Sequence, residues 1–214
     1  MRINEIFCSI QGEASFAGQP CVFVRLSGCN LRCRWCDTTY AYDESCDMSI
    51  DDVISKVSSF DCDLVEITGG EPMCQHDDAC DLMNRLIERH YTVLLETNGS
   101  LPLDDVPLAV HRIIDLKPPK SGTIHNEEIW RGYAGQWRST DEIKCVVADR
   151  ADFDWCIGKL HQYSAFHQVI IHFSPVWGEQ DPANLASWIC ESHLPIRLNL
   201  QLQKIIWDPN ARGV

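Results

Sequence analysis

The sequence predicts an α/β fold in which parallel strands form a partial (incomplete) TIM-like barrel, within a single domain of residues 1–214. Short apolar, β-branched segments alternate along the chain with segments of helical periodicity, which is typical of a parallel sheet with right-handed crossovers. The chain has 214 residues, whereas a complete eight-fold barrel takes about 250. An open barrel is therefore the better prediction.

In the first half of the chain, strands are predicted over residues 22–27, 64–68 and 92–97 from their apolar and β-branched content. Ser49 is placed to cap a helix whose apolar residues recur at helical spacing. A second helix is predicted over residues 77–89, because its leucine, methionine and isoleucine residues share one face.

The second half continues the alternation. Further strands are predicted over residues 112–116, 142–147, 168–173 and 197–202. Helices are predicted over residues 153–161 and from Asp181-Pro182, which suit the N-cap and first helical positions. Residues 118–140 contain prolines and glycines with weak periodicity, and predict either a mobile lid or a set of short connections.

Several polar or glycine residues fall at the carboxyl ends of predicted strands. These are the loop 29–36, Gly69-Gly70-Glu71, Asn98-Gly99, Lys117 and Ser174. Glycine and asparagine also end strands for conformational reasons, so no single member of this set is informative. Because the carboxyl ends of parallel strands share one edge, their coincidence predicts one active site there.

Composition excludes some classes of function. The net charge is −13 with only 18 basic residues, which argues against direct binding of a nucleic acid, since that requires clustered lysines and arginines. No stretch approaches 18 apolar residues, so no membrane segment is expected. The absence of an export signal predicts the cytoplasm, where most of the twelve cysteines would be free packing residues.

Cys29, Cys33 and Cys36 follow the first predicted strand and carry the strongest chemical signal. A structural zinc site needs four ligands, and the next cysteine, Cys46, has no partner nearby. Three thiolates can hold an iron–sulfur cluster that leaves one iron open to a substrate. A non-catalytic iron–sulfur or zinc module for electron transfer or scaffolding stays open as an alternative at this point.

The cysteine motif, with Trp35 inside it and Gly69-Gly70-Glu71-Pro72 after a strand, resembles the radical S-adenosylmethionine superfamily. Within it, the chain resembles the family of 7-carboxy-7-deazaguanine synthases over essentially its whole length. The segments that carry this resemblance are Ile6-Phe7-Cys8-Ser9-Ile10-Gln11-Gly12-Glu13, Phe23-Val24-Arg25-Leu26, Cys36-Asp37-Thr38 and Leu200-Gln201-Leu202-Gln203-Lys204-Ile205-Ile206-Trp207.

The resemblance implies a 4Fe–4S cluster, S-adenosylmethionine and Mg²⁺ as cofactors. It implies that a 5′-deoxyadenosyl radical abstracts hydrogen from C6 of 6-carboxy-5,6,7,8-tetrahydropterin, followed by ring contraction and loss of ammonia, in queuosine-type 7-deazapurine biosynthesis. A flavodoxin-type reductant and a homodimer are expected by the same analogy. An activase of the same superfamily, which would place a radical on a protein partner, is the alternative enzyme.

The resemblance also implies roles for individual residues. Cys29, Cys33 and Cys36 would bind the cluster, and Thr38 would bind Mg²⁺. The expected substrate contacts are Ile10, Gln11, Gly12, Glu13, Arg25, Thr97 and Val214. The expected cofactor contacts are Trp35, Cys36, Asp37, Gly69, Gly70, Glu71, Gly99, Lys117, Thr140, Asp141, Glu142 and Ser174. Gln203 stands where relatives often carry histidine, which puts one substrate hydrogen bond in doubt.

Side-chain chemistry supports some of these roles and leaves alternatives for others. The Arg25 guanidinium suits a bidentate carboxylate, although a buried structural ion pair would also explain an arginine in a strand. Gln11 and Glu13 match a pterin edge rich in donors and acceptors, or flank a simple turn at Gly12. Thr38 offers a hard oxygen for Mg²⁺, or belongs to a turn.

Overall fold

A computed structural model describes all residues, 1–214, and contains one sheet of nine strands. The strands are β1 (Arg2–Ile10), β2 (Pro20–Leu26), β3 (Cys46–Asp47), β4 (Leu64–Gly69), β5 (Thr92–Thr97), β6 (His111–Asp115), β7 (Glu142–Val147), β8 (Ile170–Pro175) and β9 (Ile196–Leu198). Their order is β3-β1-β2-β4-β5-β6-β7-β8-β9. The end strands do not pair, so the predicted partial barrel is confirmed.

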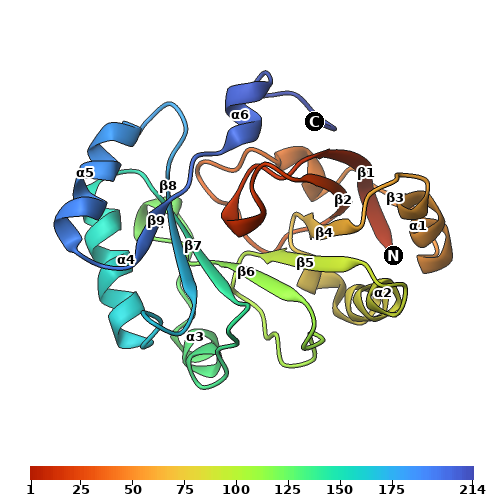
Figure 1. Ribbon diagram of the computed structural model, residues 1–214, viewed down its shortest axis with the longest axis horizontal. Helices are drawn as coiled ribbons and strands as arrows, with labels where there is room; N and C mark the ends of the chain where they lie inside the picture. The colour runs from red at the N-terminus through yellow and green to blue at the C-terminus, as the bar shows by residue number, and fades with distance from the viewer.

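Strands β2 and β4 to β9 are parallel, whereas β1 pairs antiparallel with both β2 and β3. The helices are α1 (Ile50–Ser58), α2 (His76–Glu88), α3 (Glu127–Ala134), α4 (Arg150–Gln162), α5 (Pro182–Ser192) and α6 (Leu202–Ile206). Figure 1 shows α1 to α5 around the outside of the curved sheet, with α6 on the side that the sheet leaves open. No helix is long and apolar enough to cross a membrane.

The helix caps follow the predicted chemistry. The Ser49 hydroxyl accepts a hydrogen bond from the Asp52 N–H, and the Asp181 carboxylate accepts one from the Ala183 N–H at 2.9 Å. Pro182 occupies the first turn of α5, where its missing N–H leaves no helical hydrogen bond unmade. The chain therefore starts these helices where the sequence predicts.

Two predicted strands have the wrong bounds, and one strand was not predicted. The strand predicted over 197–202 ends at Leu198, and Leu202 begins α6 instead. The strand predicted over 168–173 runs from Ile170 to Pro175, and Pro175 ends the strand beyond Phe173, the last residue of β8 that pairs with β9. Residues 118–140 are a set of short connections that include α3, capped by Asn126, and β1 was not predicted at all.

Alternation along the strands separates two apolar clusters. Residues such as Val65 and Ile67 of β4 point outward and join the main core beneath the helices. Leu64 of β4, Leu94 of β5 and Ile113 of β6 point inward and form a smaller cluster with Ala14. This apolar cluster fills the barrel at the amino-terminal ends of the strands. An interior cavity can therefore open only at the carboxyl ends of the strands or between the unpaired end strands of the sheet.

Residues 11–15 close that open side by bonding to the last elements of the chain. The Leu202 N–H donates to the Gly12 carbonyl at 3.1 Å, and the Ala14 N–H donates to Asn199 Oδ1 at 3.0 Å. The Arg197 guanidinium donates to Ser15 Oγ at 3.1 Å. The first and last elements thus complete the wall that the sheet leaves unfinished.

Candidate active site

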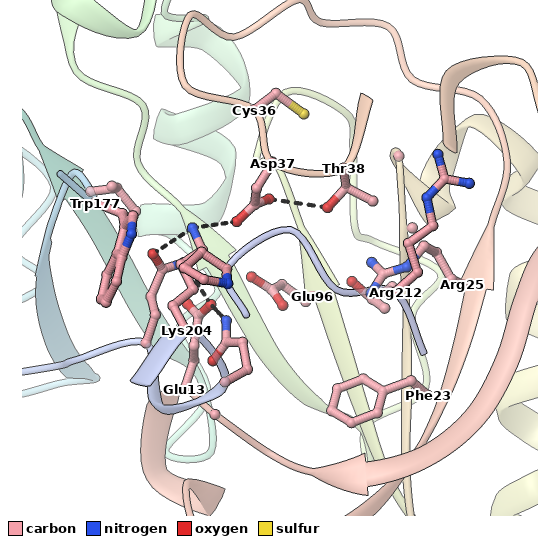
Figure 2. Close-up of a pocket in the computed structure, with 18 of the residues that line it drawn as sticks. Glu13, Phe23, Arg25, Cys36, Asp37, Thr38, Glu96, Trp177, Lys204 and Arg212 are labelled. Atoms are coloured by element: carbon pink, nitrogen blue, oxygen red, sulfur yellow. Dashed lines mark hydrogen bonds and ion pairs between the residues drawn. The ribbon is translucent and has the colours of Figure 1, made fainter. Parts of the chain in front are cut away.

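A cavity of about 620 Å³ lies inside the partial barrel. The inward-facing residues of five neighbouring strands line it: Arg25, Thr68, Glu96, Asp115 and Lys144. Of the residues predicted to bind substrate or the metal groups, those that line the cavity are Ile10, Gln11, Gly12, Glu13, Arg25, Cys29, Cys33, Cys36, Thr38, Thr97 and Val214. Figure 2 shows Arg25, Thr38 and Glu13 facing this space from different segments.

The cysteine loop follows β2 at the carboxyl edge of the sheet. Gly28 begins it with a φ of +94°, a conformation that favours glycine, and its N–H donates to the Ala41 carbonyl at 2.8 Å. Cys29 Sγ accepts from the Leu31 N–H at 3.4 Å and lies 3.8 Å from Asn98 Nδ2. Cys29 is therefore held in a donor-rich setting that suits a thiolate.

The three cysteine thiols do not converge on a position for a single ion. No three His, Cys, Asp or Glu side chains in the structure converge closely enough to hold one metal ion. A cubane takes one thiolate on each of three irons, so its ligands stand farther apart than those of one zinc ion. All three cysteines are free and line the cavity. Burial raises the pKa of the Cys29 and Cys33 thiols.

Gly69 and Gly70 bring the end of β4 against the cysteine loop. A Cβ on Gly70 would stand 2.3 Å from the Gly28 carbonyl oxygen and 2.9 Å from the Cys29 Cβ. A Cβ on Gly69 would stand 2.1 Å from the Leu26 carbonyl oxygen, and its φ is +149°. Both positions therefore require glycine, and both line the cavity beside the cysteines.

Glu71 is fully buried and does not line the cavity, unlike the two glycines before it. Its carboxylate accepts hydrogen bonds from the Met73 N–H at 2.9 Å, the Thr97 hydroxyl at 2.8 Å and the Asn98 N–H at 2.6 Å. Burial raises the pKa of Glu71 to about 7 despite these donors. Glu71 therefore links the ends of β4 and β5 by hydrogen bonds, and its contact with the cofactor stays a prediction.

Gly99 also lies outside the cavity, so the structure does not place it against a cofactor there. Its φ is +70°, and a Cβ would stand 2.8 Å from the Asp115 carbonyl oxygen and 3.0 Å from Trp130. Close backbone packing explains this glycine. Thr97, by contrast, lines the cavity while its hydroxyl donates to Glu71.

The Arg25 side chain extends from β2, and one nitrogen of its guanidinium group is already hydrogen-bonded within the protein. Its Nε donates to Glu5 Oε1 at 2.8 Å, and the Tyr40 hydroxyl donates to the same oxygen at 2.8 Å. No protein hydrogen bond occupies the two Nη groups, and Figure 2 shows them at the cavity. The ion pair expected as an alternative exists, yet it leaves a bidentate face for a carboxylate ligand.

Glu13 lies at the centre of a buried polar network. Its Oε2 pairs with Lys144 Nζ at 2.9 Å, while Oε1 accepts from Gln201 at 2.9 Å and Gln203 at 2.8 Å. Burial disfavours the charged carboxylate, but Lys144 and the amide donors outweigh burial and lower the pKa of Glu13 to about 2. Gln203, which departs from the family pattern, thus supports Glu13 and still lines the cavity.

Two more carboxyl groups, Glu66 and Glu96, lie beside Lys144 on the cavity floor. Gln11 Nε2 donates to Glu66, and Lys144 pairs with Glu96. Burial and the nearby Glu96 raise the pKa of Glu66 well above its usual range. Gln11 Oε1 also accepts from the Glu13 N–H at 3.1 Å, which fixes the turn at Gly12.

Asp37 and Thr38 place two hard oxygens at the cavity mouth. The Thr38 hydroxyl donates to Asp37 Oδ1 at 3.0 Å, and Asp37 Oδ2 pairs with Lys204 Nζ at 2.6 Å. Burial acts against the charged form of Asp37, but Lys204 outweighs it and lowers the pKa. Oxygen donors of this kind suit Mg²⁺, which needs few protein ligands.

Trp35 and Lys117 line the cavity on the cysteine side. The Arg34 guanidinium lies 4.9 Å from the Trp35 ring centroid, and Lys117 Nζ pairs with Asp115 Oδ2 at 2.7 Å. The other oxygen of Asp115 is buried without a hydrogen-bond partner. Asp115 thus lies between two ammonium groups, since this second oxygen is 3.6 Å from Lys144 Nζ.

Four further expected cofactor contacts lie outside the cavity, and their contact with a cofactor stays a prediction. Thr140, Asp141 and Glu142 stand at the amino end of β7, on the opposite edge from the cysteines, because the chain enters the strand there. Asp141 pairs with Arg112 at 2.7 Å, and Glu142 accepts from Ser15 and His172. Ser174 is fully buried, and its hydroxyl accepts from Asn199 at 2.9 Å.

Sequence reasoning missed several residues of the cavity floor, namely Glu66, Glu96, Asp115 and Lys144. Each is a charged residue inside an otherwise apolar strand, and that is the signal that could have found them. Tyr40, Lys204 and Arg212 were also missed. They come from loop, helix and tail segments whose position over the cavity depends on tertiary structure alone.

Comparison with known proteins agrees with this geometry. Residues 23–116 match the family model described as Radical SAM superfamily. A 7-carboxy-7-deazaguanine synthase of Chlorobaculum tepidum is 46% identical over 100% of this chain and 97% of its own. A second, from Koribacter versatilis, is 40% identical over 100% of both chains. The crystal structure of QueE from Escherichia coli has a TM-score of 0.74 at 23% identity, covering 94% of this chain and 93% of its own, which shows a shared fold.

The fold, the cysteine loop and the matched family model define a radical S-adenosylmethionine enzyme, which uses a 4Fe–4S cluster and S-adenosylmethionine. The full-length identities of 46% and 40% to the two synthases then specify the family within this superfamily. The chain belongs to the 7-carboxy-7-deazaguanine synthase family. This membership removes the alternatives of an activase and of a non-catalytic metal module.

Proposed function

We propose that this chain, acting as one domain, converts 6-carboxy-5,6,7,8-tetrahydropterin into 7-carboxy-7-deazaguanine with loss of ammonia, as a lyase of queuosine-type biosynthesis. One observation carries the proposal: a single cavity joins the cysteine loop to a free guanidinium face on Arg25 and a polar floor around Glu13. A carboxylated, nitrogen-rich bicycle matches that combination of groups. The proposed roles agree with the family membership of the chain.

In this proposal Cys29, Cys33 and Cys36 hold the cluster, and Gly69 and Gly70 admit S-adenosylmethionine close to the backbone. When bound and reduced, these groups supply a 5′-deoxyadenosyl radical. Trp35, Cys36, Asp37 and Lys117 remain proposed contacts of the cofactor, because they line the cavity on that side.

The substrate's carboxylate would bind the Nη groups of Arg25, since Nε is already held by Glu5. Thr38, with Asp37 beside it, would bind Mg²⁺ near that carboxylate. The pterin edge would meet the floor formed by Gln11 and Glu13. Ile10, Gly12, Thr97 and Val214 are proposed as further contacts because they line the same cavity.

The charge pattern of the floor has a chemical consequence for ammonia loss. Within one network, Lys144 and the amide donors lower the pKa of Glu13 to about 2, whereas burial and Glu96 raise the pKa of Glu66. A neutral acid beside a departing amine can supply the proton that makes it a better leaving group. The floor thus offers Glu13 as an acceptor for the substrate's N–H groups and, in Glu66, a carboxyl group of raised pKa.

Partners and location follow as parts of the same proposal. A flavodoxin-type reductant is proposed to dock beside the cysteines, where Arg32 is exposed. A homodimer would cover exposed apolar residues near the sheet edge, Leu198, Ile205 and Ile206. All twelve cysteines are free, which suits the reducing cytoplasm.

The test is anaerobic incubation of the reconstituted protein with a reductant, S-adenosylmethionine, Mg²⁺ and 6-carboxy-5,6,7,8-tetrahydropterin. We expect 7-carboxy-7-deazaguanine and ammonia in equal amounts, detected by mass spectrometry and an ammonia assay. If 5′-deoxyadenosine forms only slowly and no deazapurine appears, the substrate assignment is wrong. Omitting Mg²⁺ tests its part of the proposal separately.

A further inference from the structure

The C-terminal strap, residues 208–214, follows α6 and lines the cavity along its entire length. Figure 1 shows it leading from α6 back toward β1, and Figure 2 shows Arg212 beside Arg25 at the cavity. None of its residues is buried in the core. Its own hydrogen bonds are local, from the Asn210 and Ala211 N–H groups to Asp208.

Arg212 makes the polar contacts that join this strap to the rest of the chain. Its Nη1 donates to Glu44 Oε2 at 2.8 Å, and its Nη2 donates to Glu44 Oε1 at 3.3 Å. The same guanidinium lies over the Tyr40 ring, 3.8 Å from the centroid. No other hydrogen bond or ion pair connects residues 208–214 to the body of the protein.

Tyr40 connects this attachment to the proposed carboxylate site. Its hydroxyl donates to Glu5 Oε1 at 2.8 Å, and the same oxygen accepts from Arg25 Nε at 2.8 Å. The ring that carries Arg212 is therefore one hydrogen bond away from the carboxylate that orients Arg25. When the strap is attached at Tyr40, it lies beside an Arg25 side chain that Glu5 already orients. When the strap is detached, the side of the cavity next to Arg25 is open.

We propose that Arg212 is a positioning residue that fastens the C-terminal strap over the cavity through Glu44 and Tyr40, and so completes the substrate site. The identity of the substrate in this inference rests on the proposed function. The attachment of the strap by Arg212 does not depend on it. Both Arg212 and Glu44 are more than half exposed, at 52% and 60%. An ion pair in such a setting is weak. It can therefore open to admit substrate, which a buried anchor could not do.

Two measurements on Arg212→Ala test the proposal. The first is steady-state turnover of carboxytetrahydropterin, for which we expect KM to rise about fivefold with kcat changed by less than about twofold. The second needs no substrate: an endoproteinase that cuts before aspartate releases residues 208–214 by cleaving the Trp207–Asp208 bond. Mass spectrometry should show faster release from the variant by a similar factor.

Arg150→Ala is the matched control, because Arg150 also pairs with a carboxylate, Asp154 at 2.8 Å, and lies over an aromatic ring, but on α4 away from the cavity. It should change neither measurement. Glu44→Arg and Arg212→Glu should each behave like Arg212→Ala. The two combined restore the opposite charges and should recover at least half of the loss.

Unchanged peptide release and unchanged KM in Arg212→Ala would overturn the proposal. The proposal is also overturned if the defects of Glu44→Arg and Arg212→Glu add in the double variant. Additive defects would show that the ion pair does not fasten the strap. A purely structural role predicts lower thermal stability with no selective change in KM. Failure of the unmodified enzyme to turn over the pterin counts against the proposed function, while the peptide-release result still decides the fastening.

Discussion

Glu13 and Lys144, which are 131 residues apart in the chain, form an ion pair of 2.9 Å on the floor of the cavity. Lys144 also pairs with Glu96 and lies 3.6 Å from Asp115 Oδ1. One buried ammonium thus faces three carboxyl groups, all of them in the cavity wall. Such a cluster is stable only when complete, because a charge left unpaired at a buried site is strongly unfavourable.

Lys144→Met should therefore lower the free energy of unfolding by about 3–5 kcal/mol at neutral pH, because it leaves buried carboxylates without their cation. The Glu13 pKa of about 2 lies below its unfolded value, so its stabilising contribution is present above pH 4.5 and is lost only as pH falls through 2. In Lys144→Met the carboxyl groups can relieve their repulsion by taking up protons. The deficit relative to the unmodified protein should thus be smaller at pH 5 than at pH 8.

Urea unfolding at several pH values measures this deficit. Lys56→Met serves as the control, because Lys56 is exposed on α1 and its removal should change stability by less than about 0.5 kcal/mol. A deficit that is independent of pH would contradict the electrostatic explanation and point to lost packing instead.

The fold and the part of the site around the cysteine loop were predictable from local patterns. Thr92–Thr97 and Glu142–Val147 have the bounds that their β-branched content predicts, and Ser49 caps α1 as expected. The cysteines and Gly69-Gly70 were predictable because close approach and metal binding restrict residue type locally. These signals depend on short spacing within the chain.

The rest of the site depends on contacts that no local pattern encodes. Glu71 has the expected sequence context but is turned inward by Thr97 and Asn98. Residues 140–142 lie at the amino edge of the sheet because strand polarity decides which edge a residue reaches, and the chain enters β7 at Glu142. Arg212 lies over the cavity only because the strap folds back toward Tyr40.

Arg25→Ala should leave cluster assembly intact and raise KM for the carboxylated pterin by roughly ten- to a hundred-fold, the range for loss of a charge-assisted bidentate contact. Arg25→Lys keeps the charge but cannot both hold Glu5 and present two donors, so it should recover only part of the affinity. Iron content and the visible absorption of the cluster are the control readouts. Equal KM in all three proteins would refute the clamp.

Glu71 should make the protein less stable as pH rises through neutrality. Burial raises its folded pKa to about 7, above the unfolded value of 4.5, so its contribution is complete below pH 4.5 and is lost as pH rises through 7. The difference corresponds to about 3 kcal/mol. Glu71→Gln removes this titration, although its amide matches the three surrounding donors less well.

The unmodified protein should therefore exceed Glu71→Gln in stability by more at pH 5 than at pH 8, as measured by urea unfolding under anaerobic conditions. Parallel pH profiles for the two proteins would mean that Glu71 does not titrate in this range. Thr97→Val, which removes one donor to the carboxyl group, should raise the Glu71 pKa further and steepen the decline.

Replacement of any one of Cys29, Cys33 and Cys36 by alanine should abolish the 4Fe–4S absorption after anaerobic reconstitution, because a cluster with two protein ligands is not retained. Cys74→Ala is a stringent control, since Cys74 is a nearby exposed thiol that does not line the cavity. It should retain iron and sulfide at the level of the unmodified protein. Loss of iron from Cys74→Ala alone would reassign the ligand set.

Gly12→Ala tests how the open side of the barrel is closed. A Cβ at this position would stand 1.8 Å from Gln203 Oε1 and 3.1 Å from the Gln203 backbone nitrogen. The flexible amide should yield first and lose its hydrogen bond to Glu13, which is 2.8 Å long. Gly12→Ala and Gln203→Ala should then have similar effects on KM, and the double variant should be no worse than either.

The expected coupling between the two positions is on the order of 1 kcal/mol, the net value of the hydrogen bond that both changes remove. Gly158→Ala is the control, because its Cβ meets no atom within 4 Å and alanine favours the helix α4 in which it lies. Strict additivity of the Gly12 and Gln203 changes would show that the strain falls on the backbone of α6 instead. In that case the contact closes the barrel wall without supporting Glu13.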